Sequence, residues 1–394
     1  METAELLEIV ARNEDSNHQF KSYQFLANAS NESSLAKEMI AFSNSGGGQI
    51  FIGVNDSGTF LNLTREDMGR LSQNVSNAAS QHVQPPISVT TENVPAADGL
   101  VMVVTVADGI SKPYMDNGGA IWVKRGTDKR RRASREEIAR MCQSAGLIHG
   151  DETPASGLSV ADLDMDYFKK FFKELFGTSV DEQDVPLPKL LENMNLMKDR
   201  VLNVSGALLF AENPSFRLPV FIVKTVAYPS TGIDEENYID SQEISGKIAD
   251  VFQKSMSFVL GNIKHLQKDQ GINASGTPEI PRIVFEELIA NALIHRDYFV
   301  SAPVRMFIFS DRVEIISPGC LPNNLTIENI KSGNSNIRNP ILASYATKIL
   351  PYRGLGSGII RALKAYPDIE FENDADGNLF QVTVLRQIIG NGNS

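Results

Sequence analysis

Residues 283–299 read IVFEELIANALIHRDYF, and this stretch decides the fold of the last third of the chain. Its apolar residues recur at helical spacing, which predicts a largely buried helix. Glu287 and Asn291 stand four residues apart, so they share one side of that helix. A carboxylate and a carboxamide stacked in this way can bind a water molecule and Mg²⁺ together. We interpret Glu287 as a candidate general base and Asn291 as a candidate metal ligand; the alternative is a solvated helix face.

Two glycine-bearing segments follow this helix, SPGCLP at residues 317–322 and RGLGSGII at residues 353–360. Glycines in the second segment let a backbone approach phosphates closely, and the helix expected from Ile359 would point its first amides at them. The segment SNIRNP, residues 335–340, lies between the two and is a candidate lid.

The order of these motifs resembles the N, G1 and G2 boxes of the GHKL ATPases. The phrases NALIHRDY, SDRVEIISPGCLP, SNIRNP and RGLGSGI also resemble the C-terminal, RecG-named ATPase-type domain of a bacterial transcriptional-regulator family, over about residues 280–386. The resemblance implies a Bergerat ATPase fold that binds ATP with Mg²⁺. The nucleotide contacts that it implies are Asn291, Arg296, Asp297, Ser317, Gly319, Arg338, Asn339, Gly354, Gly356 and Gly358.

This sequence departs from the GHKL pattern at the G1 box. Most GHKL proteins have an Asp there that accepts from the adenine amino group, whereas this chain has Ser317 before Pro318 and Gly319. Base specificity therefore depends on a hydroxyl or a backbone carbonyl. For His295 and Asp297 the alternative to a role near the phosphates is a structural hydrogen bond.

The N-terminal region contains AFSNSGGGQIFIGVNDSG, residues 41–58, which predicts the end of a helix, a strand and a tight turn. The string resembles the Schlafen AlbA-like domain over about residues 14–140, and the resemblance implies nucleic-acid binding. Some Schlafen proteins cut RNA with three carboxylates. Glu14 lies where the first would be and Asp56 where the third would be, but Gln19 occupies the second position.

A basic run lies between Lys124 and Arg135 and stands out in a chain whose net charge is −11. Such a run predicts local, salt-dependent phosphate binding. The alternative is a solvated loop whose cations pair with acidic neighbours, with Trp122 and Tyr114 packed in the core. The candidate nucleic-acid contacts are Lys21, Lys124, Arg125, Lys129, Arg130, Arg131 and Arg132.

The remaining features bound the class of protein. Hydrophobic residues make up 42% and charged residues 22%, as in ordinary globular chains. No apolar run approaches the ~18 residues of a membrane span, and the acidic N-terminus does not resemble a signal peptide. Two distant cysteines fit a reducing compartment. We therefore expect a cytoplasmic protein without membrane association.

The region between the two resemblances has no catalytic motif. Residues 150–157, GDETPASG, form the most linker-like stretch, and we expect two strands at residues 204–210 and 218–226. The predicted architecture is α/β (α+β), with an AlbA-like domain at 1–150, a mixed α/β connecting module at 158–272 and a GHKL-type ATP-binding domain at 277–390.

These features together predict a nucleic-acid-binding regulator that binds ATP and Mg²⁺ and hydrolyses ATP. Nucleotide occupancy would control the assembly of its AlbA-like domains into a homo-oligomer, dimer or higher. Two alternatives belong to other classes: a nucleic-acid-binding regulator with an inert ATPase fold, and a metal-dependent Schlafen-type RNase that acts in stress or phage defence. DNA and RNA both remain candidate targets.

Overall fold

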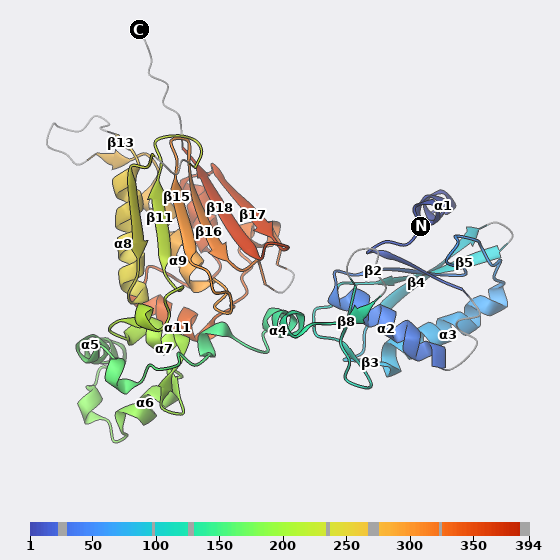
Figure 1. The fold of residues 1–394 in the computed structure, drawn as a ribbon, viewed down its shortest axis with the longest axis horizontal. Coiled ribbons are helices and arrows are strands. Elements are labelled where there is room, and N and C mark those ends of the chain that lie inside the picture. The colour runs from blue at the N-terminus through green and yellow to red at the C-terminus, as the bar shows by residue number, and fades with distance from the viewer. Residues whose placement is uncertain are drawn as a thin grey trace, which may run out of the picture. The chain divides into compact units, whose positions relative to one another are not determined.

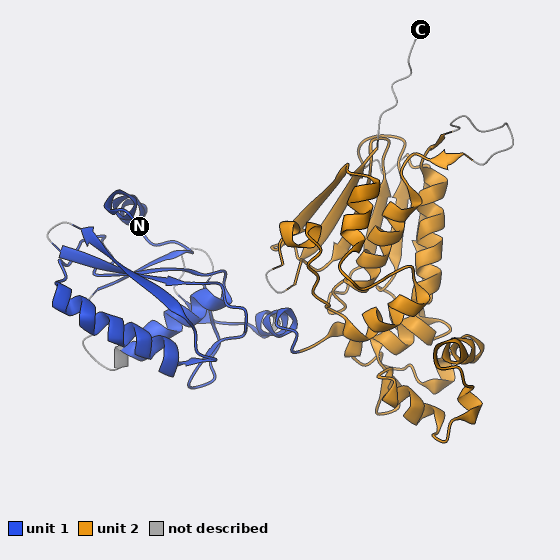
Figure 2. Ribbon diagram, turned by 180° about the vertical axis from the view of Figure 1, so that it is seen from behind, with its two compact units in different colours: residues 1–147 blue, residues 148–394 orange. Residues whose placement is uncertain are grey.

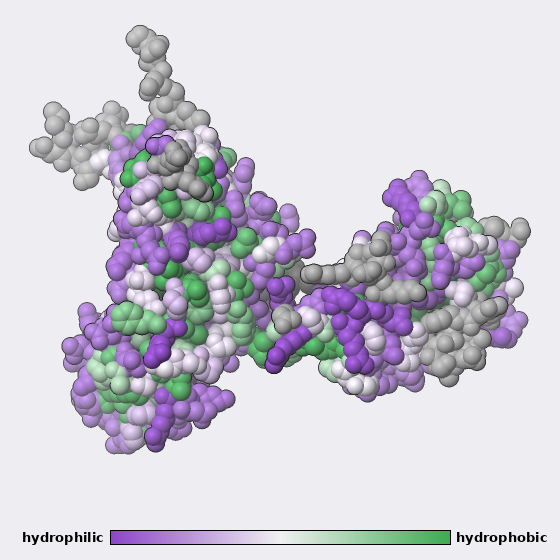
Figure 3. Space-filling model, in the orientation of Figure 1, coloured by the Kyte–Doolittle hydropathy of each residue, from purple (hydrophilic) through white to green (hydrophobic). Residues whose placement is uncertain are grey.

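The computed structural model describes residues 1–22, 30–96, 99–124, 130–233, 237–266, 276–322 and 325–386. The chain forms two compact units, Met1–Leu147 and Ile148–Ser394 (Figure 2). Across the described ranges, no helix is both long and apolar enough to cross a membrane. Hydrophilic residues are spread over the visible face of both units (Figure 3). The mixed α/β class is confirmed, and each unit is described by itself below.

The first unit is built on a four-stranded sheet in the order β1-β2-β5-β4 (Figure 1). β1 is parallel to β2, whereas β5 is antiparallel to both β2 and β4. The bounds of the strands are β1 (His18–Lys21), β2 (Gly48–Ile52), β3 (Val83–Gln84), β4 (Val89–Ala96), β5 (Gly99–Val106), β6 (Met115–Asp116), β7 (Trp122–Val123) and β8 (Arg131–Arg132). β3 pairs with β6 and β7 pairs with β8.

Helices cover both faces of this sheet. Because side chains alternate along a strand, Ile50 and Ile52 join the core under α2 (Ser30–Asn44) and α3 (Arg65–Gln81), while Phe51 joins the core under α1 (Thr3–Arg12). The unit closes with α4 (Arg135–Ser144), which begins with a capping box: the Ser134 hydroxyl accepts from the backbone N–H of Glu137.

The second unit contains a six-stranded sheet in the order β12-β11-β15-β16-β18-β17. Only the β11–β15 pair is parallel among these neighbours. The bounds of its strands are β11 (Val223–Ala227), β12 (Asp240–Ile244), β15 (Val304–Ile308), β16 (Arg312–Pro318), β17 (Ile369–Asp374) and β18 (Leu379–Leu385). Two short pairs accompany it, β9 (Met197–Lys198) with β10 (Val201–Leu202) and β13 (His265–Leu266) with β14 (Thr277–Pro278).

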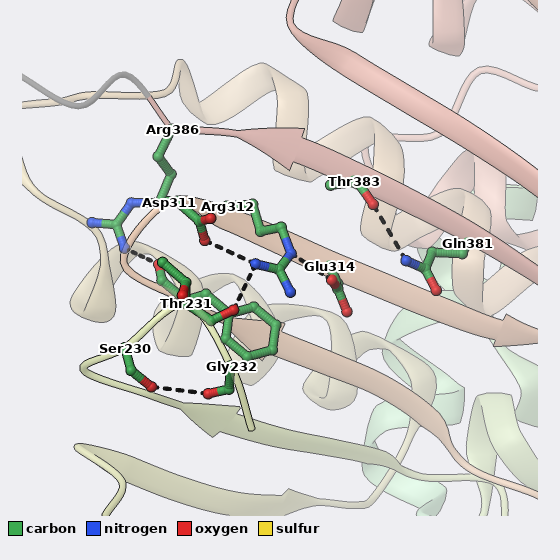
Figure 4. Close-up of polar contacts among 10 residues, drawn as sticks. Ser230, Thr231, Gly232, Asp311, Arg312, Glu314, Gln381, Thr383 and Arg386 are labelled. Atoms are coloured by element: carbon green, nitrogen blue, oxygen red, sulfur yellow. Dashed lines mark hydrogen bonds and ion pairs between the residues drawn. The ribbon is translucent and has the colours of Figure 1, made fainter. Parts of the chain in front are cut away.

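One face of the six-stranded sheet is covered by α8 (Ile248–Asn262), α9 (Arg282–Ile294) and α12 (Gly358–Ala365) (Figure 2). The opposite face carries polar side chains at alternate positions. There Arg312 donates to Asp311 at 2.9 Å, to Glu314 at 2.6 Å and to the Thr231 carbonyl at 2.8 Å (Figure 4). The other helices are α5 (Met165–Phe176), α6 (Leu187–Asn193), α7 (Val204–Phe210), α10 (Ile327–Lys331) and α11 (Pro340–Ile349).

The expected connecting module and ATP-binding domain share one hydrophobic core. Phe252 of α8 and Val223 of β11 belong to the same buried cluster as Leu288 of α9 and Val384 of β18. β11 is also hydrogen-bonded along its length to β15. The division of 158–272 from 277–390 stays a prediction, but the two parts pack as one unit.

Two local expectations in this region are wrong. Residues 204–210, expected as a strand, form the helix α7, and all seven of its residues are buried. A short run that is apolar throughout has no period that separates a strand from a buried helix. The Asn203 side chain, which accepts from the Gly206 N–H at 2.8 Å, caps this helix.

The expected linker is also part of the second unit. Gly150–Glu152 forms a 3-10 turn in which Asp151 is fully buried. Its carboxylate accepts from the backbone N–H of Leu342 and from the Ser205 hydroxyl. The polar composition of GDETPASG therefore reflects a buried cap rather than a loose connection.

Candidate nucleotide site and nucleic-acid surface

The second unit has a cavity where α9, the end of β16 and the glycine loop before α12 meet. Several of the residues expected to contact nucleotide line it. These are Glu287, Asn291, Ser317, Gly319, Gly354, Gly356 and Gly358. The structure thus brings together three motifs whose outermost residues, Glu287 and Gly358, stand 71 positions apart in the sequence.

Glu287 and Asn291 face the first residue of α12. A Cβ added to Gly358 would lie 2.5 Å from Glu287 Oε2 and 3.4 Å from Asn291 Nδ2. A side chain at 358 would therefore displace the Glu287 carboxylate or α12. The N-cap of α12, Ser357, makes no side-chain capping hydrogen bond, so the first amides of α12 remain available to an anion.

Glu287 is 2% exposed, and its Oε1 lies 2.6 Å from Nη2 of Arg361. The contact is an ion pair without hydrogen-bond alignment: within the described chain, Glu287 Oε1 and Arg361 Nε have no hydrogen bond. Burial raises the pKa of the Glu287 carboxyl, and the Arg361 guanidinium opposes that rise. A carboxyl with a raised pKa is a suitable proton acceptor near neutral pH.

Asn291 lines the same cavity, on the same side of α9 as Glu287. An uncharged oxygen ligand beside phosphates is what Mg²⁺ accepts in proteins. The residues present therefore fit a magnesium ion held by Asn291 together with phosphate oxygens.

One part of the cavity wall is apolar and suits a nucleobase. Its apolar lining includes Leu288, Ile315, Leu321, Leu325, Ile330, Phe380 and Val382. Ser317 stands at this end, and its hydroxyl donates to the Ala292 carbonyl at 3.1 Å. Because that hydrogen is committed to α9, the Ser317 oxygen is oriented as an acceptor.

The loop before α12 needs glycine at Gly354 and Gly356 because both have positive φ, at 66° and 69°. At Gly356 a Cβ would also collide with the Gly333 carbonyl. At Gly319, where φ is 103°, a Cβ would collide with the Arg338 guanidinium. Backbone geometry thus explains these three glycines without any ligand.

Four expected nucleotide contacts do not line the cavity. Arg338 donates to the carbonyls of Cys320 and His295, and Asn339 donates to the carbonyls of Ile294 and Arg296 at the end of α9. These bonds hold the G1 turn against α9. Both side chains are thus engaged within the described chain, and the lid role expected for Arg338 and Asn339 stays a prediction.

Arg296 and Asp297 are also buried and occupied. Arg296 donates to the Ala302 carbonyl at 2.6 Å, and its guanidinium lies 4.7 Å from the Phe221 ring centre. Asp297 accepts from the backbone N–H of Phe299. All four side chains thus make structural contacts here, and their contact with nucleotide stays a prediction.

Arg361 and Tyr352, which the sequence did not single out, also line the cavity, together with His295. The only sequence signal of Arg361 is its position three residues after Gly358, on the same face of α12. His295 and Tyr352 are joined by a 3.0 Å contact between Nε2 and the hydroxyl. Burial and the nearby Arg338 lower the pKa of His295 to about 4, so the imidazole is neutral near pH 7.

In the first unit, Glu14, Gln19 and Lys124 form a buried cluster. The Gln19 amide donates to Glu14 and accepts from Lys124 Nζ at 2.8 Å. Burial lowers the pKa of Lys124, which Glu38 and Glu14 oppose. Asp56 is exposed on the turn after β2.

The described residues contain no group of three or more His, Cys, Asp or Glu side chains placed to hold a metal ion. Gln19 joins Glu14 to a lysine instead of supplying a second acid. The residues present therefore do not fit the three-carboxylate metal site of Schlafen nucleases.

The other cations expected to contact nucleic acid differ in whether an acidic side chain already pairs with them. Lys21 and Arg130 both pair with the buried carboxylate of Glu38, and Arg131 makes two bonds to Glu137, at 2.9 and 2.7 Å. Arg132 is exposed, and its guanidinium lies 5.9 Å from the Trp122 ring centre. Arg125 and Lys129 lie outside the described residues.

Comparisons with known proteins find one family model toward each end of the chain. Residues 14–134 match the family model "Schlafen, AlbA_2", and residues 301–384 match the model "Putative ATP-dependent DNA helicase recG C-terminal". The second match begins after α9, so Glu287 and Asn291 precede it. No curated protein matches the chain.

Two solved structures resemble the chain weakly. The crystal structure of the DIP2311 protein from Corynebacterium diphtheriae has 20% identity and a TM-score of 0.47, covering 98% of this chain and 80% of that one. The solution structure of the N-terminal domain of a RecG-related protein from Nitrosomonas europaea has 17% identity and a TM-score of 0.25. It covers 34% of this chain and 96% of its own.

The two domain types suggest nucleic-acid binding in the first unit and ATPase-type nucleotide binding in the second. The expected resemblances are thus confirmed for both ends of the chain. The chain thus has an N-terminal region similar to Schlafen AlbA_2 domains and a C-terminal region similar to recG C-terminal, HATPase-type domains.

Proposed function

We propose that the second unit binds ATP with Mg²⁺ in the cavity between α9 and α12 and hydrolyses it. The observation that carries this proposal is the approach of Glu287 and Asn291 to the uncapped start of α12 across Gly358. A base, a metal ligand and backbone donors then surround one point, which is what phosphate hydrolysis requires.

Each residue has a separate task. Glu287 accepts a proton from a water molecule as the water oxygen bonds to the terminal phosphorus and the bond from that phosphorus to the leaving diphosphate breaks. Asn291 holds Mg²⁺, which would neutralise phosphate charge. The α12 amides receive phosphate oxygens, and the apolar wall with the Ser317 oxygen receives the base.

The first unit supplies the partner in this proposal. Arg132, exposed beside Trp122, would contact the phosphates of DNA or RNA, and nucleotide occupancy in the second unit would control assembly of the protein into a homo-oligomer. This coupling is testable by light scattering of the full chain without nucleotide, with ADP, and with a nonhydrolysable ATP analogue. A mass that stays the same in all three conditions contradicts nucleotide-controlled assembly.

Calorimetry of ATP binding, with and without Mg²⁺, tests the nucleotide site. We expect wild type to bind, and we expect Asn291→Ala to lose the Mg²⁺-dependent part of the affinity. Glu287→Ala should abolish phosphate release but retain binding, because the base acts on water and not on the nucleotide.

Glu286→Ala is the matched control, because Glu286 is the adjacent carboxylate on α9 and pairs with Arg282 at 2.7 Å outside the cavity. It should bind and hydrolyse ATP as wild type does. If wild type binds no nucleotide, the proposal fails, and the second unit is an inert ATPase fold attached to a nucleic-acid-binding domain.

A further inference from the structure

We propose that Arg361 is shared between two anions: in the ligand-free chain it pairs with Glu287, and the terminal phosphate of a bound nucleoside triphosphate takes the place of that carboxylate. Arg361 would then be the residue that distinguishes triphosphate from diphosphate and releases Glu287 for catalysis. This inference rests on the function proposed above and adds a specificity residue to that site.

The first observation is the position of the Glu287 carboxylate. One oxygen lies 2.6 Å from Arg361 Nη2, and the other would be 2.5 Å from a Cβ on Gly358, the first residue of α12. The carboxylate therefore occupies both features of the cavity that attract an anion, a guanidinium and a helix N-terminus. A negatively charged side chain stands where phosphate oxygens are expected.

The second observation is that the pair leaves hydrogen-bonding groups unused. Glu287 Oε1 and Arg361 Nε are buried atoms without a hydrogen bond among the described residues. An aligned Arg–carboxylate pair would use two parallel N–H donors, so this contact falls short of the strongest available arrangement. A tetrahedral phosphate offers further oxygens to the same guanidinium and can satisfy the unused Nε–H.

The third observation is access. The Arg361 side chain is 27% exposed, whereas Glu287 is 2% exposed. Both side chains line the cavity, and the Arg361 side chain is the more accessible of the two. Because α12 side chains lean toward the helix N-terminus, Arg361 can serve an anion at Gly358 without moving its backbone.

Exchange of the two anions has a catalytic consequence. While Glu287 is paired with Arg361, its proton-accepting oxygen is held by a cation and is a weaker base. A phosphate that takes over Arg361 frees this carboxylate to bind water only when a triphosphate is in place. The device therefore couples substrate recognition to activation of the base.

The test is calorimetry of the full chain with a nonhydrolysable ATP analogue and with ADP, both with Mg²⁺. Arg361→Gln should weaken triphosphate binding about tenfold or more and affect ADP much less, since a charged hydrogen bond is lost only with the triphosphate. Glu287→Gln should tighten triphosphate binding, because it removes the competing carboxylate. Arg361→Lys should recover part of the discrimination.

Lys364→Gln is the control for loss of one positive charge on α12; Lys364 is exposed one turn further on and should change neither affinity. Thermal unfolding of each variant checks folding, and if Arg361→Gln is unfolded, Glu287→Gln and Arg361→Lys decide the question. The acid limb of the kcat/KM profile, which reports the ligand-free chain, should move to higher pH in Arg361→Lys if the lysine pairs with Glu287 less closely.

The outcomes separate the two proposals. If wild type binds neither ligand, the nucleotide site itself is wrong, and the inference falls with it. If wild type binds both but Arg361→Gln weakens them equally, or Glu287→Gln weakens the triphosphate, the nucleotide site stands and the shared-anion inference is overturned.

Discussion

Asp151 Oδ2 accepts a 2.9 Å hydrogen bond from the backbone N–H of Leu342, which lies 191 residues further along the chain. Leu342 is the third residue of α11, so this carboxylate caps a helix that is distant from Asp151 in the sequence. The other oxygen, Oδ1, is buried without a hydrogen bond in the described part of the chain. The bond fixes the start of the second unit to the helix that follows the G1 turn.

Substitutions of Asp151 should separate its cap from its charge. Burial raises the pKa of Asp151 above its usual value, so the folded state binds this proton more tightly than the unfolded state. The resulting stability is fully present below the unfolded pKa and is lost as pH rises through the folded pKa. We therefore expect the stability of Asp151→Asn relative to wild type, measured by thermal unfolding, to increase as pH rises from about 4, near the usual Asp pKa, to about 8.

Asp151→Ala provides the comparison, because it removes both the cap and the charge. It should be destabilised relative to Asp151→Asn by about 1 kcal/mol at every pH, the usual cost of a lost helix cap. A difference between wild type and Asp151→Asn that does not vary with pH would show that the carboxyl titrates at its ordinary pKa.

Gly358→Ala should damage the nucleotide site. The added Cβ would lie 2.5 Å from Glu287 Oε2, so either the carboxylate or α12 must move. We expect loss of hydrolysis together with weaker ATP binding, measured by phosphate release and calorimetry. Gly261→Ala on α8 is the control, because a Cβ there meets nothing within 4 Å; it should be neutral or stabilising by about 0.5–1 kcal/mol. Equal effects of the two substitutions would contradict the close approach at Gly358.

The sequence predicted this site in part because two of its features are local. Apolar spacing identified α9, and four-residue spacing placed Glu287 and Asn291 on one side of it. The glycines at 354, 356 and 358 marked a loop that leads into a helix. Each of these features depends on the residues of a single segment, so the spacing of residues within that segment can predict it.

The roles that escaped prediction depend on contacts between distant segments. Arg361 lies beside Glu287 only because α12 packs on α9. Arg338 and Asn339 donate hydrogen bonds to carbonyls that lie 43 to 45 residues earlier in the chain. Residues 204–210 form a helix where the sequence predicts a strand, because a fully buried run has no polar side chains whose spacing would distinguish the helical period from the strand period. A single sequence contains no local signal for such pairings.

Ser317→Ala should weaken adenine recognition. The Ser317 hydroxyl donates to the Ala292 carbonyl, which leaves its oxygen as an acceptor for the exocyclic amino group. We expect ATP affinity to fall about tenfold, as for loss of one buried hydrogen bond. GTP affinity should fall less, because guanine presents a carbonyl oxygen at the equivalent position. Competition calorimetry with ATP and GTP measures both, and an unchanged ratio would show that a backbone group reads the base.

Arg132 and Arg131 are adjacent cations with different surroundings, and they should differ in nucleic-acid binding. Arg131 is held by two bonds to Glu137, whereas Arg132 is exposed beside the Trp122 ring. Arg132→Ala should therefore weaken binding of a short single-stranded oligonucleotide and lower the slope of log affinity against log salt by about one phosphate contact. Arg131→Ala removes the same charge but should change the slope less, because its guanidinium is already neutralised. Fluorescence anisotropy over a salt series, with DNA and RNA oligonucleotides, measures both variants. Equal slopes for the two variants would place the phosphates elsewhere on the first unit.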